Sequence, residues 1–454
     1  MSAQMKTRWI LLATVSAGLL LITIDNSVLY TALPTLTREL GANPTESLWI
    51  INAYPLVMAG LLLGAGTLGD RIGHKRMFVI GLVVFGAASL LAAFSPTPEV
   101  LIAARGLLAV GAAAMMPATL ALIRVGFDDQ RERNIAISVW GSVAVLGAAL
   151  GPIVGGALLE WFWWGSVFLV NVPVVVVALV AALIVAPGGD RDRSRPWDLL
   201  SSVQAMLGLG GLVVALKEAT KTDPSWLVVT VAAVIGAIAF ALFIRRQRRL
   251  PYPLLDLTLF RIPALSAGVV AAGLSLFAVA GVELATSQYF QVVAGFTPLQ
   301  AGLIVVSFAV GSLPSSLLGG AILHRVGPRM LIAGGLAIAA SGVVLAIALL
   351  PLGWGGLVVG LVLAGIGLGF VMASASSAIV GSAPRHRAGM ASSVEEVSYE
   401  FGGLVAVAVL GNLIFSIESG YPVVMAIVAA VLVGGAILTW LMLRRTDATA
   451  LAAH

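Results

Sequence analysis

Long hydrophobic stretches alternate along the chain with short segments that hold most of its charged side chains. A helix needs roughly 20 apolar residues to cross a bilayer, and backbone groups in lipid must pair within the protein. The stretches lack the residue-by-residue alternation of barrel strands, so we expect helices. They predict an all-α membrane protein with 14 transmembrane helices, grouped six, two and six, near residues 9–33, 48–68, 77–94, 99–123, 135–158, 165–186, 198–217, 225–244, 264–290, 299–320, 330–350, 354–380, 390–415 and 421–443.

This grouping divides the chain into three parts. Residues 1–186 are predicted to form an N-terminal six-helix bundle, residues 187–250 two extra central helices with a basic cytosolic loop, and residues 251–454 a C-terminal six-helix bundle with a short tail. Lys6 and Arg8 precede a first stretch that is long enough to span and lacks a clear cleavage site. We therefore interpret this stretch as the first helix and not as a signal peptide.

Composition argues against several classes of protein. Hydrophobic residues make up 59% of the 454 and charged residues 10%, which is too apolar for a soluble multidomain protein. Without cysteine, the chain has no disulfide, thiolate nucleophile or cysteine zinc site. The four histidines lie in predicted loops or the tail, so we expect no metal site. The lack of a Walker loop and of a sizeable extramembrane segment argues against an enzyme.

Basic side chains orient the predicted helices. If the N-terminus is cytosolic, 22 of the 26 Lys and Arg residues fall on the cytosolic side, Arg38, Lys217 and Lys221 fall outside, and only Arg105 lies within a helix. This asymmetry follows the positive-inside rule and predicts that both termini are cytosolic, in the cytoplasmic (inner) membrane. The net charge of +5 then reflects topology and not a nucleic-acid partner. We interpret the arginine cluster at 245–249 as a topological anchor, with recruitment of anionic lipid or a partner as the alternative.

The chain also contains an internal repeat. A basic loop segment that begins at Gly66 recurs at Gly320, and Gly111 in the fourth predicted helix corresponds to Gly365 in the twelfth; both pairs are 254 positions apart. Two such halves of one fold place a substrate site between them, near the middle of the membrane.

The first copy of this loop resembles the signature G-x-L-a-D-R-x-G-r-K of the major facilitator superfamily, with His74 where arginine is usual. The number of predicted helices is similar to that of its fourteen-helix drug:proton antiporter branch. The resemblance implies a conformational latch that must break when the cytosolic side opens. Its residues are Gly66, Asp70, Arg71, Gly73, Lys75 and Arg76. Plain positive-inside anchoring is the alternative, and it would not require Asp70 or the glycines.

Two charged residues lie within predicted helices of the N-terminal half. Asp25 stands in a segment similar to that branch's L-D-x-T-V-v-N-V-A-L-P, and Arg105 opens a segment that resembles the superfamily's R-x-x-x-G motif. Burial disfavours the charged form of a carboxyl group, so we expect Asp25 to bind and release a proton near neutral pH. A buried guanidinium stays charged and needs a partner, for which Asp25 is the natural candidate and a backbone carbonyl the alternative. The pair is predicted to couple proton binding to transport; a static role for Asp25 is the alternative.

The fifth predicted helix carries small residues four apart and a proline that bends it. Small residues at helix contacts are common, but the sequence pattern G-x-x-x-G-P-x-x-G-G resembles the antiporter motif of the superfamily. This resemblance implies export. The residues are Gly147, Gly151, Pro152, Gly155 and Gly156.

Acidic residues also lie within predicted helices of the C-terminal half. Glu283 stands alone in an apolar run, whereas Glu396 and Glu400 share a helical face beside Tyr399. Like charges this close resist joint ionisation, so we expect one of the pair to hold a proton at neutral pH. Glu395 lies one residue off that face and receives the least weight. A buried acid can serve a purely structural pairing, but the excess of acids over buried bases requires protons or a cationic substrate.

The chain departs from the branch at two places. Exporters of quaternary ammonium compounds and dyes in this branch usually carry an aspartate in a W-I-V-D-x-Y segment, where this chain has Asn52, two residues before Tyr54. Asn52 therefore puts the export of divalent cations in doubt. The joint at 415–421 is also shorter than in several of those exporters, so we expect no external lid there.

These observations predict a proton-coupled antiporter that exports lipophilic cationic drugs, dyes and quaternary ammonium antiseptics. Asp25, Arg105, Glu396 and Glu400 are predicted to couple protons, and the substrate site is predicted to include Glu283, Glu396, Glu400, Tyr54 and Tyr399. The proton gradient supplies the energy, so no cofactor is expected. The expected partners are small lipophilic cations, protons and membrane lipid, and the expected state is a monomer. Export of a host metabolite, lipid or natural product is the alternative, and a membrane sensor without transport is less favoured.

Overall fold

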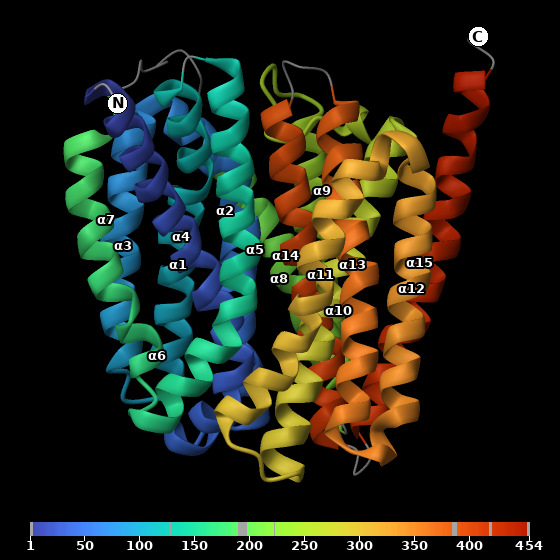
Figure 1. The fold of residues 1–454 in the computed structure, drawn as a ribbon. Coiled ribbons are helices and arrows are strands. Elements are labelled where there is room, and N and C mark those ends of the chain that lie inside the picture. Colours follow the sequence, from blue (N-terminus) through green and yellow to red (C-terminus); the bar gives the residue numbers. More distant parts are fainter. Residues whose placement is uncertain are drawn as a thin grey trace. The chain divides into compact units, whose positions relative to one another are not determined.

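The computed structural model is built from helices, as the hydrophobic pattern predicts (Figure 1). It describes residues 3–127, 129–188, 198–221, 223–383, 388–416 and 420–451, and no strand occurs in these ranges. Thirteen helices of the described chain are long and apolar enough to cross a membrane. A fourteenth long helix, α2 (Pro44–Ile72), contains no charged residue between positions 48 and 65. The predicted 14 spans are therefore in keeping with the structure.

The helices form two compact units, which are described separately. The first comprises residues 1–206 together with 297–302, and the second comprises residues 207–296 together with 303–454. The three-part division at residues 186 and 250 stays a prediction. In Figure 1 the long helices within each unit run up and down along a common direction, as expected for a multi-pass membrane protein.

The first unit is built on seven helices. They are α1 (Ala3–Leu40), α2 (Pro44–Ile72), α3 (His74–Ala93), α4 (Pro98–Gly126), α5 (Gln130–Trp161), the short α6 (Ser166–Leu169) and α7 (Asn171–Val185). Local sequence explains several of the starts. Asn43 caps α2 through a capping box with Glu46, and Thr97 caps α4, each followed directly by a proline at the first helical position.

The second unit contains most of the remaining helices. They are α9 (Trp226–Gln247), α10 (Pro263–Gln288), α11 (Pro298–Val326), α12 (Pro328–Leu349), α13 (Trp354–Ser382), α14 (Ala388–Ser416) and α15 (Gly420–Leu451), with the short helical segments η1 (Leu257–Arg261), η2 (Tyr289–Val293) and η3 (Leu350–Leu352). Helix α8 (Leu199–Ala219) begins in the first unit and continues into the second, and the first turn of α11 likewise belongs to the first unit.

The internal repeat is visible in the backbone. Gly73 lies between α2 and α3 with φ of +98°, and Gly327 lies between α11 and α12 with φ of +83°. The two glycines are 254 positions apart, which is the offset found in the sequence. Each donates its backbone N–H to the carbonyl four residues earlier, at 2.9 Å, and so ends the preceding helix. A side chain in this backbone conformation would be strained, which explains glycine at both places.

The C-terminal end of α8 is fastened to α14. The Asn412 side chain donates from Nδ2 to the Lys217 carbonyl at 2.6 Å and to Thr220 Oγ1 at 2.8 Å, and Thr220 Oγ1 donates to the Ala408 carbonyl at 3.2 Å. This packing leaves the Lys217 residue 3% exposed. Lys217 is therefore buried, and Arg105 is not the only buried basic residue. The predicted external placement of Lys217 stays a prediction.

Candidate functional site

Asp25 and Arg105 form a buried ion pair in the first unit. Arg105 Nη1 on α4 contacts Asp25 Oδ2 on α1, and both side chains are 0% exposed. Arg105 Nε also donates to the Ile50 carbonyl of α2 at 3.2 Å. Both partners expected for the guanidinium, the carboxylate and a backbone carbonyl, are thus present together. Because protonation of Asp25 would remove the negative charge, proton binding has to disrupt this ion pair.

A third helix completes the surroundings of Asp25. Asn171, the first residue of α7, donates from Nδ2 to Asp25 Oδ1 at 3.0 Å and to Ser89 Oγ of α3 at 3.3 Å. Each carboxylate oxygen therefore has its own partner on a different helix. Neither Asn171 nor Ser89 was among the predicted site residues. The available signal was weak, since each is a single neutral polar residue in an otherwise apolar run.

Tyr54 covers the guanidinium of Arg105. The distance from Arg105 Cζ to the Tyr54 ring centroid is 4.6 Å, within cation–π range. Tyr54 has no exposed surface in this conformation, so its predicted role in substrate binding stays a prediction. Two residues earlier, Asn52 is also fully buried, and neither atom of its amide group has a hydrogen-bond partner within the described part of the chain.

The small residues of the antiporter motif pack against the helix that carries Asp25. A Cβ atom added to Gly147 would overlap Thr23, one added to Gly151 would overlap Ser27, and one added to Gly155 would overlap Val28. Ser27 Oγ also lies 3.4 Å from the Gly147 carbonyl, to which it can donate. Pro152 and Gly156 are buried on the same helix. The spacing of four residues therefore lets α5 lie directly against the segment of α1 around Asp25.

The predicted latch loop joins α2 and α3. Gly66 lies within α2, Gly73 makes the turn, and Arg71 and Arg76 are exposed. Lys75 Nζ donates to the Leu183 carbonyl at 2.9 Å, and this bond ties the loop to the last turn of α7, where a cation is favoured. The side chain of Asp70 lies outside the part of the structure that is described. The latch role stays a prediction.

Among the acids of α14, Glu395 is the one that bonds to Tyr399, beside which Glu396 and Glu400 were predicted to lie. Glu395, which received the least weight, accepts hydrogen bonds from Ser376 Oγ at 3.3 Å and from Tyr399 Oη at 3.4 Å. Tyr399 therefore pairs with Glu395, four residues earlier, and its ring packs on a core cluster that includes Leu265 and Ile379. Glu395 and Glu400 are close enough for their negative charges to repel a negative charge on Glu396.

Glu283 and Glu400 are largely enclosed in the second unit, with 8% of each residue exposed. Glu283 lies on α10 and has no hydrogen bond or ion pair with any other described residue. A buried carboxyl group without a counter-charge is costly when ionised, so it favours a proton or a cation nearby. The structure thus holds a paired acid, Asp25, in the first unit and an acid without an ion pair to a described residue, Glu283, in the second.

Comparisons with known proteins identify the family of the chain. The sequence profile of the Major Facilitator Superfamily matches residues 15–282 and again residues 264–453. The chain is 39% identical to the methyl viologen resistance protein SmvA of Salmonella typhimurium, over 90% of this chain and 82% of the relative. It is 38% identical to the multidrug efflux pump LfrA of Mycolicibacterium smegmatis, over 89% of this chain and 80% of the relative.

A solved structure shares the fold. The crystal structure of the peptide transporter POT in complex with sulfate aligns with a TM-score of 0.71 and 16% identity, and covers 97% of this chain and 94% of that one. The chain belongs to the major facilitator superfamily of membrane transporters. Two of its similar relatives carry names that refer to resistance and multidrug efflux.

Proposed function

We propose that this protein is a proton-driven exporter of lipophilic cations, among them quaternary ammonium compounds and cationic dyes. The observation that carries the proposal is the buried Asp25–Arg105 ion pair, whose carboxylate is held by α4 and α7 at once. The likeness of the chain to SmvA and LfrA over most of its length supports an efflux function. Both termini are proposed to face the cytosol.

The proposed cycle uses competition between protons and cargo. In the inward-open state the ionised carboxylates of the second unit, Glu283, Glu396 and Glu400, attract the cation. Protons that enter from outside then neutralise these groups and release the cation. Coupling requires this competition, because a proton and a cation that bind independently cannot drive one another. Each charge moved across 100 mV contributes about 2.3 kcal/mol, which supports useful accumulation ratios.

Protonation of Asp25 is proposed to change the contacts that it and Arg105 make between helices. While Asp25 is ionised, its contacts join α1 to α4 and α7. When Asp25 takes up a proton, Arg105 loses its counter-charge and these contacts weaken. The tight packing of α5 against α1 then offers a surface along which α1 can shift.

Proton release from purified protein tests the proposal. Addition of ethidium to the protein in weakly buffered detergent solution should acidify the medium, and Glu396→Gln should reduce the signal. Glu160→Gln, which removes an exposed carboxyl group at the end of α5, serves as the matched control. Dye efflux from cells should stop when an uncoupler is added. The proposal fails if no proton is released and if Asp25→Asn and Glu396→Gln both transport normally.

A binding screen distinguishes the cargo. Monovalent and divalent cations, a neutral compound and an anionic compound are compared at equal lipophilicity. The proposal expects monovalent cations to bind best, because Asn52 supplies no second negative charge in the first unit. A neutral or anionic compound as the best ligand would instead indicate export of a different class of molecule.

A further inference from the structure

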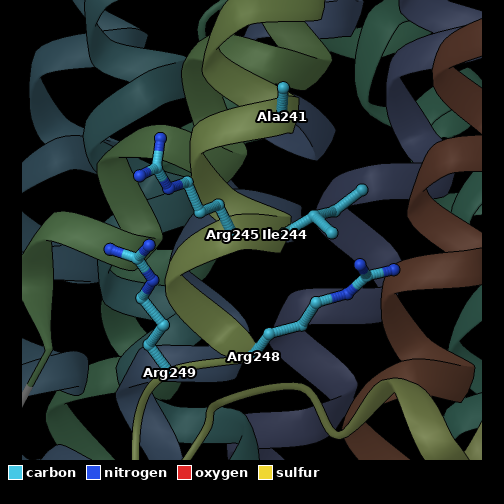
Figure 2. Close-up of a pocket in the computed structure, with 5 residues that line it drawn as sticks. All are labelled: Ala241, Ile244, Arg245, Arg248 and Arg249. Atoms are coloured by element: carbon cyan, nitrogen blue, oxygen red, sulfur yellow. The ribbon is translucent and has the colours of Figure 1, made fainter.

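Three arginines surround a pocket at the C-terminal end of α9. The pocket has a volume of about 400 Å³ and is lined by Ala241, Ile244, Arg245, Arg248 and Arg249. Figure 2 shows Arg245 and Arg249 extending to one side of the helix, one turn apart, while Arg248 extends to the other side. Two guanidinium groups at this spacing can approach a single phosphate group together.

No acidic residue neutralises these arginines in the surrounding sequence. Between Asp223 and Asp256 the chain contains four arginines and no Asp or Glu. Within the described part of the chain, Arg245, Arg248 and Arg249 form no ion pair. The positive charge of the pocket is therefore open to an anion from outside the chain.

An exposed apolar stripe on α9 leads to the same arginines. Ile235, Ile238 and Leu242 are 51%, 55% and 47% exposed, and they precede Arg245 at spacings of three and four residues. Side chains at this spacing share one face of a helix. A lipid whose acyl chain lies along the stripe would therefore place its head group at Arg245 and Arg249.

The chain beyond the arginines is fixed in place. The buried Gln247 side chain accepts hydrogen bonds from the backbone N–H groups of Leu254 at 2.8 Å and of Leu255 at 3.2 Å. Residue 247 lies between Arg245 and Arg249, so these bonds hold the end of α9 and the segment that follows it. The arginines thus project from an ordered helix end.

We propose that this pocket binds an anionic phospholipid of the adjacent leaflet, with its phosphate between Arg245 and Arg249 and an acyl chain along the stripe. In the proposed orientation this leaflet is the cytosolic one. Arg248 contributes further positive charge from the other side of the helix. A role limited to topology would need the charges alone and not two arginines extended side by side from one side of the helix.

Lipid titration of the purified full chain tests the site. Binding of phosphatidylglycerol is measured by native mass spectrometry, with phosphatidylcholine as the uncharged comparison. Arg245→Gln with Arg249→Gln should weaken phosphatidylglycerol binding roughly tenfold or more, because two charge-assisted contacts are lost. The matched control, Arg261→Gln with Arg325→Gln, removes the same charge from two exposed arginines elsewhere and should bind as the unmodified protein does. Equal weakening in both variants would overturn the proposal.

Two further measurements apply to the unmodified protein, so the test does not depend on folding of a variant. A photoactivatable phosphatidylglycerol should label peptides from the second half of α9 in preference to those from other exposed helices. Inorganic phosphate at the same concentration should not displace it. Labelling spread evenly over the protein, or displacement by inorganic phosphate, would contradict a lipid site.

Discussion

Asn171 donates a hydrogen bond of 3.0 Å to Asp25, on the carboxylate oxygen that Arg105 does not contact. The bond connects the first residue of α7 to the buried ion pair between α1 and α4. Since Asn171 carries no charge, it can orient the carboxylate without fixing its protonation state. Asp25 is therefore held by a partner that remains available when the ion pair with Arg105 is disrupted.

Replacing Asn171 with alanine should impair coupling more than folding. A hydrogen bond to a charged group contributes about 1.5–3 kcal/mol, so we expect efflux in Asn171→Ala to fall roughly tenfold. Ser89→Ala is the control, because Ser89 contacts the same amide group and not the carboxylate. Dye efflux at matched expression is the measurement. Equal efflux in the two variants would show that the contact with Asp25 is unimportant.

Removing only one charge of the ion pair should destabilise the protein. Asp25→Asn leaves the buried Arg105 without a counter-charge, which costs about 3–5 kcal/mol in buried pairs. The double variant Asp25→Asn with Arg105→Gln should recover much of the thermal stability in detergent and still fail to transport. Recovery of stability without transport separates a coupling role from a purely structural one. If the double variant transports at the normal rate, Asp25 does not carry the coupling proton.

The contact between α5 and α1 predicts a sharp difference between two glycines on one helix. A Cβ atom at Gly151 would overlap the Ser27 side chain, whereas a Cβ atom at Gly141 would have nothing within 4 Å. Gly151→Ala should cost about 1–3 kcal/mol and reduce efflux, and Gly141→Ala should do neither. Adding Ser27→Ala to Gly151→Ala should restore only part of the loss, because the Ser27 Cβ remains 2.8 Å away. Thermal unfolding in detergent measures both effects.

The sequence predicted the fold well because membrane helices must be long, apolar and internally paired. The contact between Arg105 and Asp25 was also predictable, since a base within a membrane helix needs an acid. Asn171 was not, because a single neutral polar residue fits many positions in a helix. The buried Lys217 has its backbone carbonyl bonded by Asn412, which is 195 positions away, and no local pattern reveals such a contact.

The connection between α8 and α14 predicts a structural role for Asn412. Its side chain makes two hydrogen bonds to α8 and the residue that follows it, to the Lys217 carbonyl and to Thr220 Oγ1. Asn412→Ala should lower stability by about 1–3 kcal/mol, because the Lys217 carbonyl and the part-buried Thr220 hydroxyl each lose a hydrogen-bond partner. Thr230→Ala is the control, since Thr230 is exposed and bonds only to its own helix. An unchanged melting temperature in Asn412→Ala would mean that α8 is held by other contacts.

Adjacent acids on α14 should respond in opposite ways when each is neutralised. Glu395 accepts hydrogen bonds from Ser376 and Tyr399, so Glu395→Gln replaces one accepting oxygen with an amide and should lower thermal stability by about 1 kcal/mol. Glu396 accepts no hydrogen bond from a described side chain and is repelled by its two acidic neighbours, so Glu396→Gln should keep or raise stability.

Transport should show the reverse order of effects. Glu396→Gln removes a charge that no described group pairs, so we expect cation efflux to fall at least tenfold and the binding of a cationic dye to weaken. Glu395→Gln should retain most of the efflux, because its carboxyl group is already engaged by two hydroxyls. Dye binding by fluorescence and efflux in cells measure the two variants side by side. If Glu395→Gln abolishes dye binding while Glu396→Gln leaves it unchanged, the cation binds at Glu395, and the hydroxyls of Ser376 and Tyr399 position that carboxylate.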